Sequence, residues 1–92
     1  MDIYAQLAAR IIKEQQSIIG PLALAQAQKV NGLSAPNADD IKIQGNGKEV
    51  LENLVEQYEK FFGQTSVEVC KQAIEPMADK LSPNQLPDIL KN

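Results

Sequence analysis

The sequence predicts an all-α fold, a compact bundle of four to five helices with one extended loop or short strand at about residues 41–44. Apolar residues recur at the helical spacing of three and four in three long stretches. Glycine or proline separates these stretches, and only one short stretch alternates apolar and polar residues as a strand does. A length of 92 residues, of which 43% are hydrophobic and 23% charged, fits one small helical domain over residues 1–92.

Residues 2–19 form the first predicted helix, whose apolar face spans about half of the helix circumference. A face this wide contacts more than one neighbouring helix. Gln15 lies within it, where the amide either specifies the partner or register of a helix contact or reaches solvent at the edge. The apolar positions of this helix are Ile3, Tyr4, Leu7, Ala8, Ile11, Ile12, Ile18 and Ile19.

The pair Gly20-Pro21 interrupts this helix, because proline cannot donate a main-chain hydrogen bond and clashes with the preceding turn. The pair either kinks one continuous helix or separates two, and Pro21 suits the first turn of a second helix. That helix is predicted to run to Val30, and Asn31-Gly32 ends it. Its residues are small or apolar on most sides, which allows neighbouring helices to approach closely.

Residues 33–47 are the least regular part of the chain, and Ser34-Ala35-Pro36-Asn37 predicts a loop. Within this part, Ile41–Gln44 alternates apolar and polar side chains as a short strand does. No second strand is visible in the sequence. The segment is therefore either an extended loop that covers the core or a strand that pairs with the same strand of another copy.

A third helix is predicted at about residues 48–62, with one apolar face that includes Leu54, Tyr58 and Phe61. Asn46 and Glu49 have the spacing of a capping box at its start, and glycine follows its end.

A fourth helix follows, with Thr65 and Glu68 as its predicted cap. Its apolar positions step by three and four residues along one seam. Pro76 lies within the seam and predicts a kink or a restart of the helix. Ser82-Pro83 can begin another helical turn, and residues 87–90 can form a short terminal helix. The seam consists of Val67, Cys70, Ile74, Met77 and Leu81.

Composition excludes several classes of function. The chain has no histidine and one cysteine, which argues against a Ser-His-Asp triad and a Cys/His zinc site, and we expect no enzyme activity and no cofactor. The net charge of −3 opposes binding to nucleic acid or anionic lipid. The longest apolar run, Ile18–Ala25, is far shorter than the roughly twenty residues of a membrane span. No signal peptide is recognisable and one cysteine forms no internal disulfide, so a cytoplasmic location is expected.

The turn Gly45-Asn46-Gly47-Lys48 has some features of a phosphate-binding loop, since it leads into a helix that begins with lysine. The phosphate-binding motif needs glycine at the position of Lys42 and serine or threonine at that of Glu49. Because neither requirement is met, the turn is predicted to cap the helix rather than to bind an anion.

Two further motifs are predicted to have a structural role rather than a binding or catalytic one. The joint at residues 62–67 has the length and the glycine of a helix-turn-helix, but the helix after it offers only Lys71 and Gln72 against two glutamates. An αα-hairpin is therefore predicted. Cys70 lies on the apolar seam and the chain has no histidine to activate it, which indicates a buried structural cysteine.

Glu52, Glu56 and Glu59 lie along one side of the third helix, and we call them the acidic stripe. They form either a solvated face, with Lys48–Glu52 and Glu56–Lys60 as ion pairs one turn apart, or a docking surface for a basic partner. The negative net charge comes from this half of the chain, since residues 47–92 carry five basic and eight acidic side chains.

These features together predict a non-catalytic protein-interaction or regulatory domain that self-associates through its N-terminal helices, as a homodimer or with another protein. The wide apolar face of the first helix and the strand without a visible partner both favour a second copy. The alternative function is the binding of a small apolar ligand between the first and fourth helices. The residues predicted for self-association are Ile3, Leu7, Ile11, Gln15, Ile18, Leu22, Ile41 and Ile43.

Overall fold

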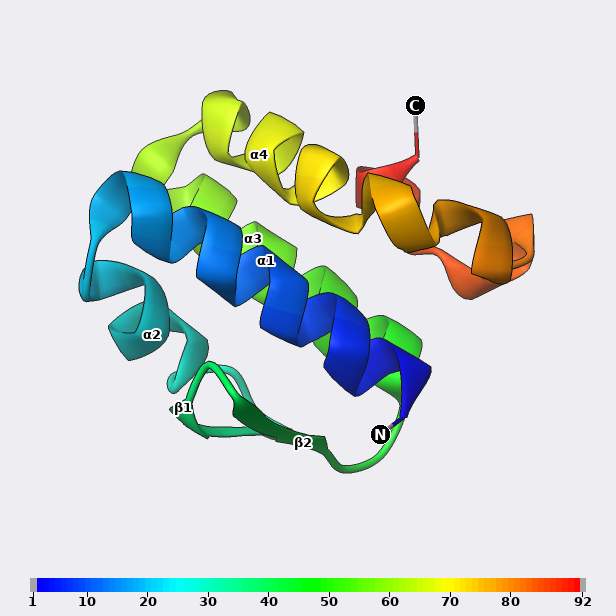
Figure 1. The fold of residues 1–92 in the computed structure, drawn as a ribbon, viewed down its shortest axis with the longest axis horizontal. Helices are drawn as coiled ribbons and strands as arrows, with labels where there is room; N and C mark the ends of the chain where they lie inside the picture. Colours follow the sequence, from blue (N-terminus) through cyan, green and yellow to red (C-terminus); the bar gives the residue numbers. More distant parts are fainter. Residues whose placement is uncertain (1, 92) are drawn as a thin grey trace.

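A computed structural model describes residues 2–91 of the chain. This part folds into four α-helices and a two-stranded antiparallel sheet, followed by three short 3-10 helices (Figure 1). In chain order the elements are α1 (Ile3–Ile19), α2 (Leu22–Ala27), β1 (Leu33–Asn37), β2 (Asp40–Ile43), α3 (Gly47–Phe62), α4 (Gln64–Ile74), η1 (Glu75–Lys80), η2 (Pro83–Gln85) and η3 (Asp88–Leu90).

The central element is α1, which contacts α2, α3, α4 and β2. In Figure 1, α3 lies behind α1, α4 runs along one side of it, and α2 with the sheet covers the other side. The predicted class is confirmed in its coarse form, because the structure is compact and mostly helical, with a small sheet in addition.

The core is formed where α1, α3 and α4 meet. Each large apolar side chain buried there contributes about 1.5–3 kcal/mol of transfer free energy. α1 is covered on several sides by helices of its own chain, and most of its wide apolar face is filled without a second copy. The largest fully buried apolar side chains are Tyr58, Leu7, Ile11, Ile12, Leu51, Leu54, Val55 and Val67.

The break at Gly20-Pro21 separates two helices. Gly20 has a φ of 67°, in the left-handed region that favours glycine, and its N–H donates to the Gln16 carbonyl at 3.0 Å to close α1. Pro21 then occupies the N-cap position of α2. This second helix ends at Ala27, earlier than the predicted end at Val30.

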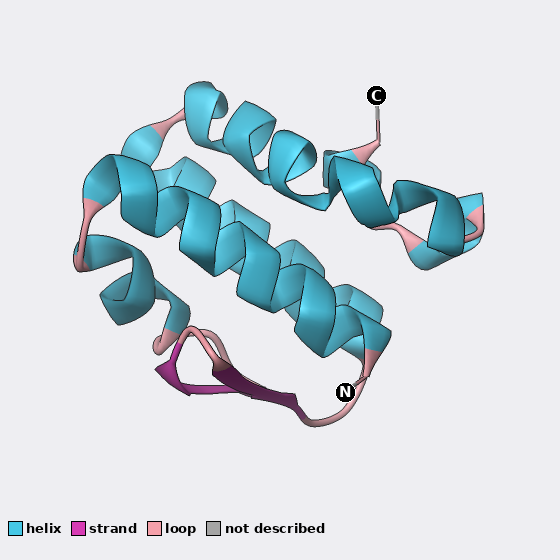
Figure 2. Ribbon diagram, viewed as in Figure 1, coloured by secondary structure: helices cyan, strands magenta, loops and turns pink. Residues whose placement is uncertain are grey.

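The segment 34–37, predicted as a loop, belongs to the strand β1, which pairs with β2. Leu33 pairs with Ile43 and Ser34 with Lys42 in an antiparallel hairpin, shown in magenta in Figure 2. The register shifts between Ser34 and Asn37, where Pro36 cannot donate a hydrogen bond to the ladder. The predictions of a loop at residues 34–37 and of a strand without a partner in its own chain are therefore wrong.

The helix α3 begins within one residue of its predicted start. The Asn46 side chain accepts a hydrogen bond from the Glu49 N–H at 3.1 Å, which is half of the predicted capping box. Gly63, with a φ of 81°, closes the helix as predicted by donating its N–H to the Glu59 carbonyl at 2.8 Å. The chain then turns directly into α4, so the predicted αα-hairpin is confirmed.

The start of α4 differs from the prediction. The helix begins at Gln64 after Gly63 and has no side-chain cap, so the predicted cap at Thr65 is wrong. The Ser66 hydroxyl instead donates to the Gly63 carbonyl at 2.7 Å. The restart predicted at Pro76 is confirmed, because α4 ends at Ile74 and the chain continues as the 3-10 helix η1.

Candidate functional site

The structure divides the residues predicted for self-association by their exposure. Four are buried in the chain's own core, where α2, α3, α4 and β2 pack on α1. Leu7, Ile11 and Gln15 lie on α1, and Ile41 lies on β2. Ile3 and Ile43 are half-buried against that core. Only Ile18 and Leu22 are exposed, with 60% and 51% of their surface accessible. The apolar face of α1 as a whole is therefore not available to a second copy. Of the residues predicted for self-association, Ile18 and Leu22 remain accessible to one.

Gln15 sets a helix register inside this chain. Its side chain is 1% exposed, and Nε2 donates to the Ser66 carbonyl at 3.0 Å and to the Cys70 sulfur at 3.4 Å. The interpretation that the amide reaches solvent is wrong. Because a buried amide needs these acceptors, Gln15 stabilises one alignment of α1 against α4.

Cys70 is buried beneath these contacts, as predicted for a structural cysteine. Burial raises the pKa of its thiol to about 11, and the hydrogen bond from Gln15 offsets part of that rise. The thiolate that a catalytic or redox cysteine requires is therefore disfavoured at neutral pH.

This raised pKa predicts a loss of stability in alkaline solution. The ordinary thiol pKa of 9.0 lies below the folded value of about 11, so between these values the unfolded state releases its proton first. Ionisation of Cys70 should lower the free energy of unfolding by about 2 kcal/mol across this window and have no effect below it. Burial also raises the pKa of the Tyr58 hydroxyl, so Tyr58 adds to the total fall at the alkaline end. Urea unfolding at about pH 8 and about pH 10.5 measures the fall. Cys70→Ala should show a smaller fall, and an equal one would contradict this explanation.

Three large apolar side chains lie exposed at one end of the molecule. Ile18 lies in the last turn of α1, Leu22 begins α2 and Phe61 lies in the last turn of α3. In Figure 1 these three segments lie at the end where α3 turns into α4. Phe61 is 51% exposed, although its spacing predicts the buried face of α3. We call Ile18, Leu22 and Phe61 the end patch. Large apolar side chains exposed at one end of a small domain are candidates for an interaction site.

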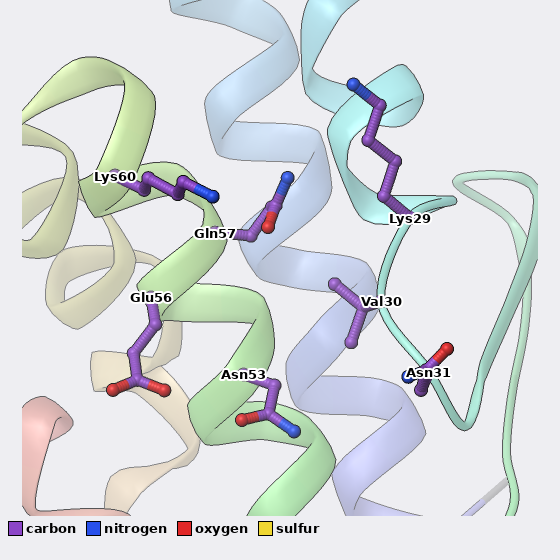
Figure 3. A pocket seen from close by; sticks show the side chains of 7 residues that line it. All are labelled: Lys29, Val30, Asn31, Asn53, Glu56, Gln57 and Lys60. Atoms are coloured by element: carbon purple, nitrogen blue, oxygen red, sulfur yellow. The ribbon is translucent and has the colours of Figure 1, made fainter.

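Two lysines flank Phe61. The Lys29 and Lys60 amines lie 5.7 and 5.5 Å from the centre of its ring, within the range of cation–π attraction. Both lysines also line a polar hollow of about 290 Å³ between the end of α2 and α3 (Figure 3). The hollow is completed by Val30, Asn31, Asn53, Glu56 and Gln57. A mixed apolar and cationic surface therefore extends from the end patch into this hollow.

The acidic stripe stays on the outer face of α3. Glu56 is exposed, and Glu52 and Glu59 are half-buried. The predicted pair Glu56–Lys60 is not formed, and in Figure 3 the Glu56 carboxylate points away from the Lys60 amine. Among residues 2–91, the ion pairs within 4.0 Å are Lys13–Asp39, Lys71–Glu68 and Lys91–Asp88, so the pair Lys48–Glu52 is not formed either.

The glycine-rich turn before α3 serves as a cap. The Glu49 N–H donates to the Asn46 side chain, as described above. In addition, the ring of Tyr4 packs so closely on Gly47 that a side-chain β-carbon at this position would lie within 3.0 Å of the ring. The Tyr4 hydroxyl donates to the Gln85 carbonyl at 2.8 Å, so this ring joins the start of α1 to the turns after α4. The prediction that the turn caps a helix is confirmed.

Over residues 2–91, no group of three or more cysteine or acidic side chains is placed to hold a metal ion. No helix in that range is long and apolar enough to cross a membrane. The hollow between α1 and α4, about 170 Å³, is lined by Arg10, Lys13, Glu14 and Ala73, and its charge does not fit the apolar ligand predicted there.

Comparison with protein-family models, with curated proteins and with solved structures finds no match to this chain.

Proposed function

We propose that this chain is a non-catalytic interaction domain that self-associates through the end patch. The observation that carries the proposal is the exposure of Ile18, Leu22 and Phe61 together at one end of the bundle. Two of the three belong to the N-terminal helices, from which the sequence predicts self-association. Covering a large apolar side chain removes it from water and contributes about 1.5–3 kcal/mol.

The charges around the end patch favour a second copy as the partner. Lys29 and Lys60 flank Phe61, and Glu56 lines the same hollow as these two lysines. In a two-fold pair, each copy offers this carboxylate to the lysines of the other, as interfaces with one apolar centre and a polar rim do. Glu56 of the acidic stripe then acts as part of the docking surface predicted for a basic partner, with lysines of the second copy as that partner.

The mass of the protein in solution tests this proposal. Light scattering or sedimentation should show an average mass that rises above that of one copy at tens of micromolar. The double variant Leu22→Ser/Phe61→Ser should weaken this association at least tenfold, because about 1.4 kcal/mol corresponds to a factor of ten. Gln72→Ser, at an exposed position of α4, is the matched control and should associate like the natural chain. A natural chain that stays monomeric over this range contradicts the proposal.

A second candidate function is the binding of a small apolar ligand, at a different place from the one predicted. A hollow of about 280 Å³ lies between α4 and the turns that follow it. Its apolar lining includes Ile74, Leu81, Leu86 and Leu90. This volume is just below that of common ligand pockets, so it suits a small apolar molecule. A rise in melting temperature with short-chain alcohols, abolished by Leu86→Glu, tests this candidate.

A further inference from the structure

The strand β2 has one edge without a partner. Its other edge pairs with β1 in a sheet of two strands. A hollow of about 480 Å³ is lined by five consecutive residues of this region, Asp40–Gln44, together with Asp2 and Ala5 from the start of α1. No residue of β1 lines it, so the hollow runs along the edge of β2 that faces away from β1. A strand edge beside an open groove is a site at which another strand can add to a sheet.

We propose that a second copy of this chain adds its own β2 to this edge, antiparallel and centred on Ile41, independently of the end patch. The two sites lie at opposite ends of α1, since β2 lies near the start of α1 and the end patch includes its last turn (Figure 1). The joined strands would form one continuous four-stranded sheet across the two copies.

The hydrogen-bond pattern of the hairpin supports this register. The Gln44 N–H donates to the Gly32 carbonyl at 2.8 Å, across to the chain that leads into β1. In an antiparallel ladder the main-chain groups alternate between the two edges, so those of Ile41 and Ile43 face the open edge. A strand centred on Ile41 therefore meets Ile41 of the second copy as a pair that exchanges two main-chain hydrogen bonds. The Ile41 side chain stays in its own core, where it is 3% exposed.

The charges of β2 select the same register. Asp40 and Lys42 are both exposed, and neither forms an ion pair within 4.0 Å in residues 2–91. Pairing centred on Ile41 places Asp40 of each copy opposite Lys42 of the other, so two opposite-charge pairs form. The Asp40–Lys42 positions would be non-hydrogen-bonded pairs of the antiparallel ladder, in which the two side chains lie closest together. Pairing centred on Lys42 would instead place the two lysines opposite each other, which is unfavourable.

The test uses charge reversal in the background of Leu22→Ser/Phe61→Ser, in which the end patch is disabled. In that background the chain should still associate at high concentration. Asp40→Lys alone and Lys42→Asp alone should each weaken association at least tenfold, because each places like charges opposite each other twice. The double change Asp40→Lys/Lys42→Asp should restore it. A mixture of the two single variants should form mixed pairs, detected by native mass spectrometry, since every opposed pair is then of opposite sign.

Matched controls are Asp79→Lys and Lys80→Asp, which make the same changes in charge at exposed positions of η1 and should leave association unchanged. Amide hydrogen exchange at Ile41 and Ile43 should slow with increasing protein concentration. Single variants that associate like their parent, or a mixture that forms no mixed pairs, would overturn the proposal. The end patch is judged separately, by comparing the natural chain with the Leu22→Ser/Phe61→Ser background.

Discussion

Tyr58→Ala is expected to lower the free energy of unfolding by about 3–5 kcal/mol, the range for removing a buried aromatic ring. Tyr58 is fully buried on α3, and its hydroxyl donates to the Ala23 carbonyl of α2 at 2.7 Å. The substitution therefore leaves a cavity and also removes one of the hydrogen bonds between these two helices. A small domain has only about 5–15 kcal/mol of stability, so a substantial part of it would be lost.

Tyr58→Phe separates these two contributions. It keeps the ring and removes only the hydroxyl, so the expected loss is about 1–2 kcal/mol, the range for a lost buried hydrogen bond. Urea unfolding at neutral pH measures both variants. If Tyr58→Ala costs no more than Tyr58→Phe, the ring does not fill the core as described.

Gln15→Glu is expected to have an effect of similar size, about 3–5 kcal/mol near pH 7. The natural amide donates to the Ser66 carbonyl and the Cys70 sulfur in a site that is 1% exposed. A carboxylate there has no donor for these acceptors and is buried without a counter-charge. Its pKa in the folded state should therefore rise above the ordinary value of about 4.3.

The pH dependence of this variant identifies the cause. When the folded-state pKa of a carboxyl group is raised, the unfolded state ionises first as the pH rises, so stability falls between the two pKa values. Relative to the natural chain, the variant should recover stability as the pH is lowered toward about 4. Gln15→Leu is the control, since it removes the amide without adding charge. An equal, pH-independent loss in both variants would contradict the explanation by buried charge.

The long helices could be predicted because their boundaries are encoded locally. Gly20 and Gly63 end α1 and α3 by taking positive φ values, and Asn46 caps α3 with its own side chain. These preferences operate within a few residues of the helix ends. The position of the short terminal helix after Pro87 follows from the same kind of evidence.

The strand β1 could not be predicted for the opposite reason. Its sequence, from Leu33 to Asn37, contains proline and has no favourable strand composition. It is extended because β2 pairs with it and α2 packs beside it, and neither contact is visible in the segment itself. Tertiary context here overrides local preference.

The end patch was predictable only in part. Ile18 and Leu22 are among the residues predicted for self-association, whereas Phe61 has the spacing of a core residue. Helical periodicity says which side of a helix is apolar but not how far the neighbouring helices extend along it. Phe61 is in the last turn of α3, and it is half-exposed despite its place on the apolar face.

The hydrogen bond from the Tyr4 hydroxyl to the Gln85 carbonyl joins the helix that the ribosome makes first to residues that it makes much later. The helix made first, α1, finds its contacts with α4 and with the turns after it only when those late residues have been made. Until then its wide apolar face has no complete set of partners, and exposed surface of this kind is prone to aggregation or to capture by chaperones. The order of synthesis therefore leaves the N-terminal helix as the nascent segment in greatest need of protection.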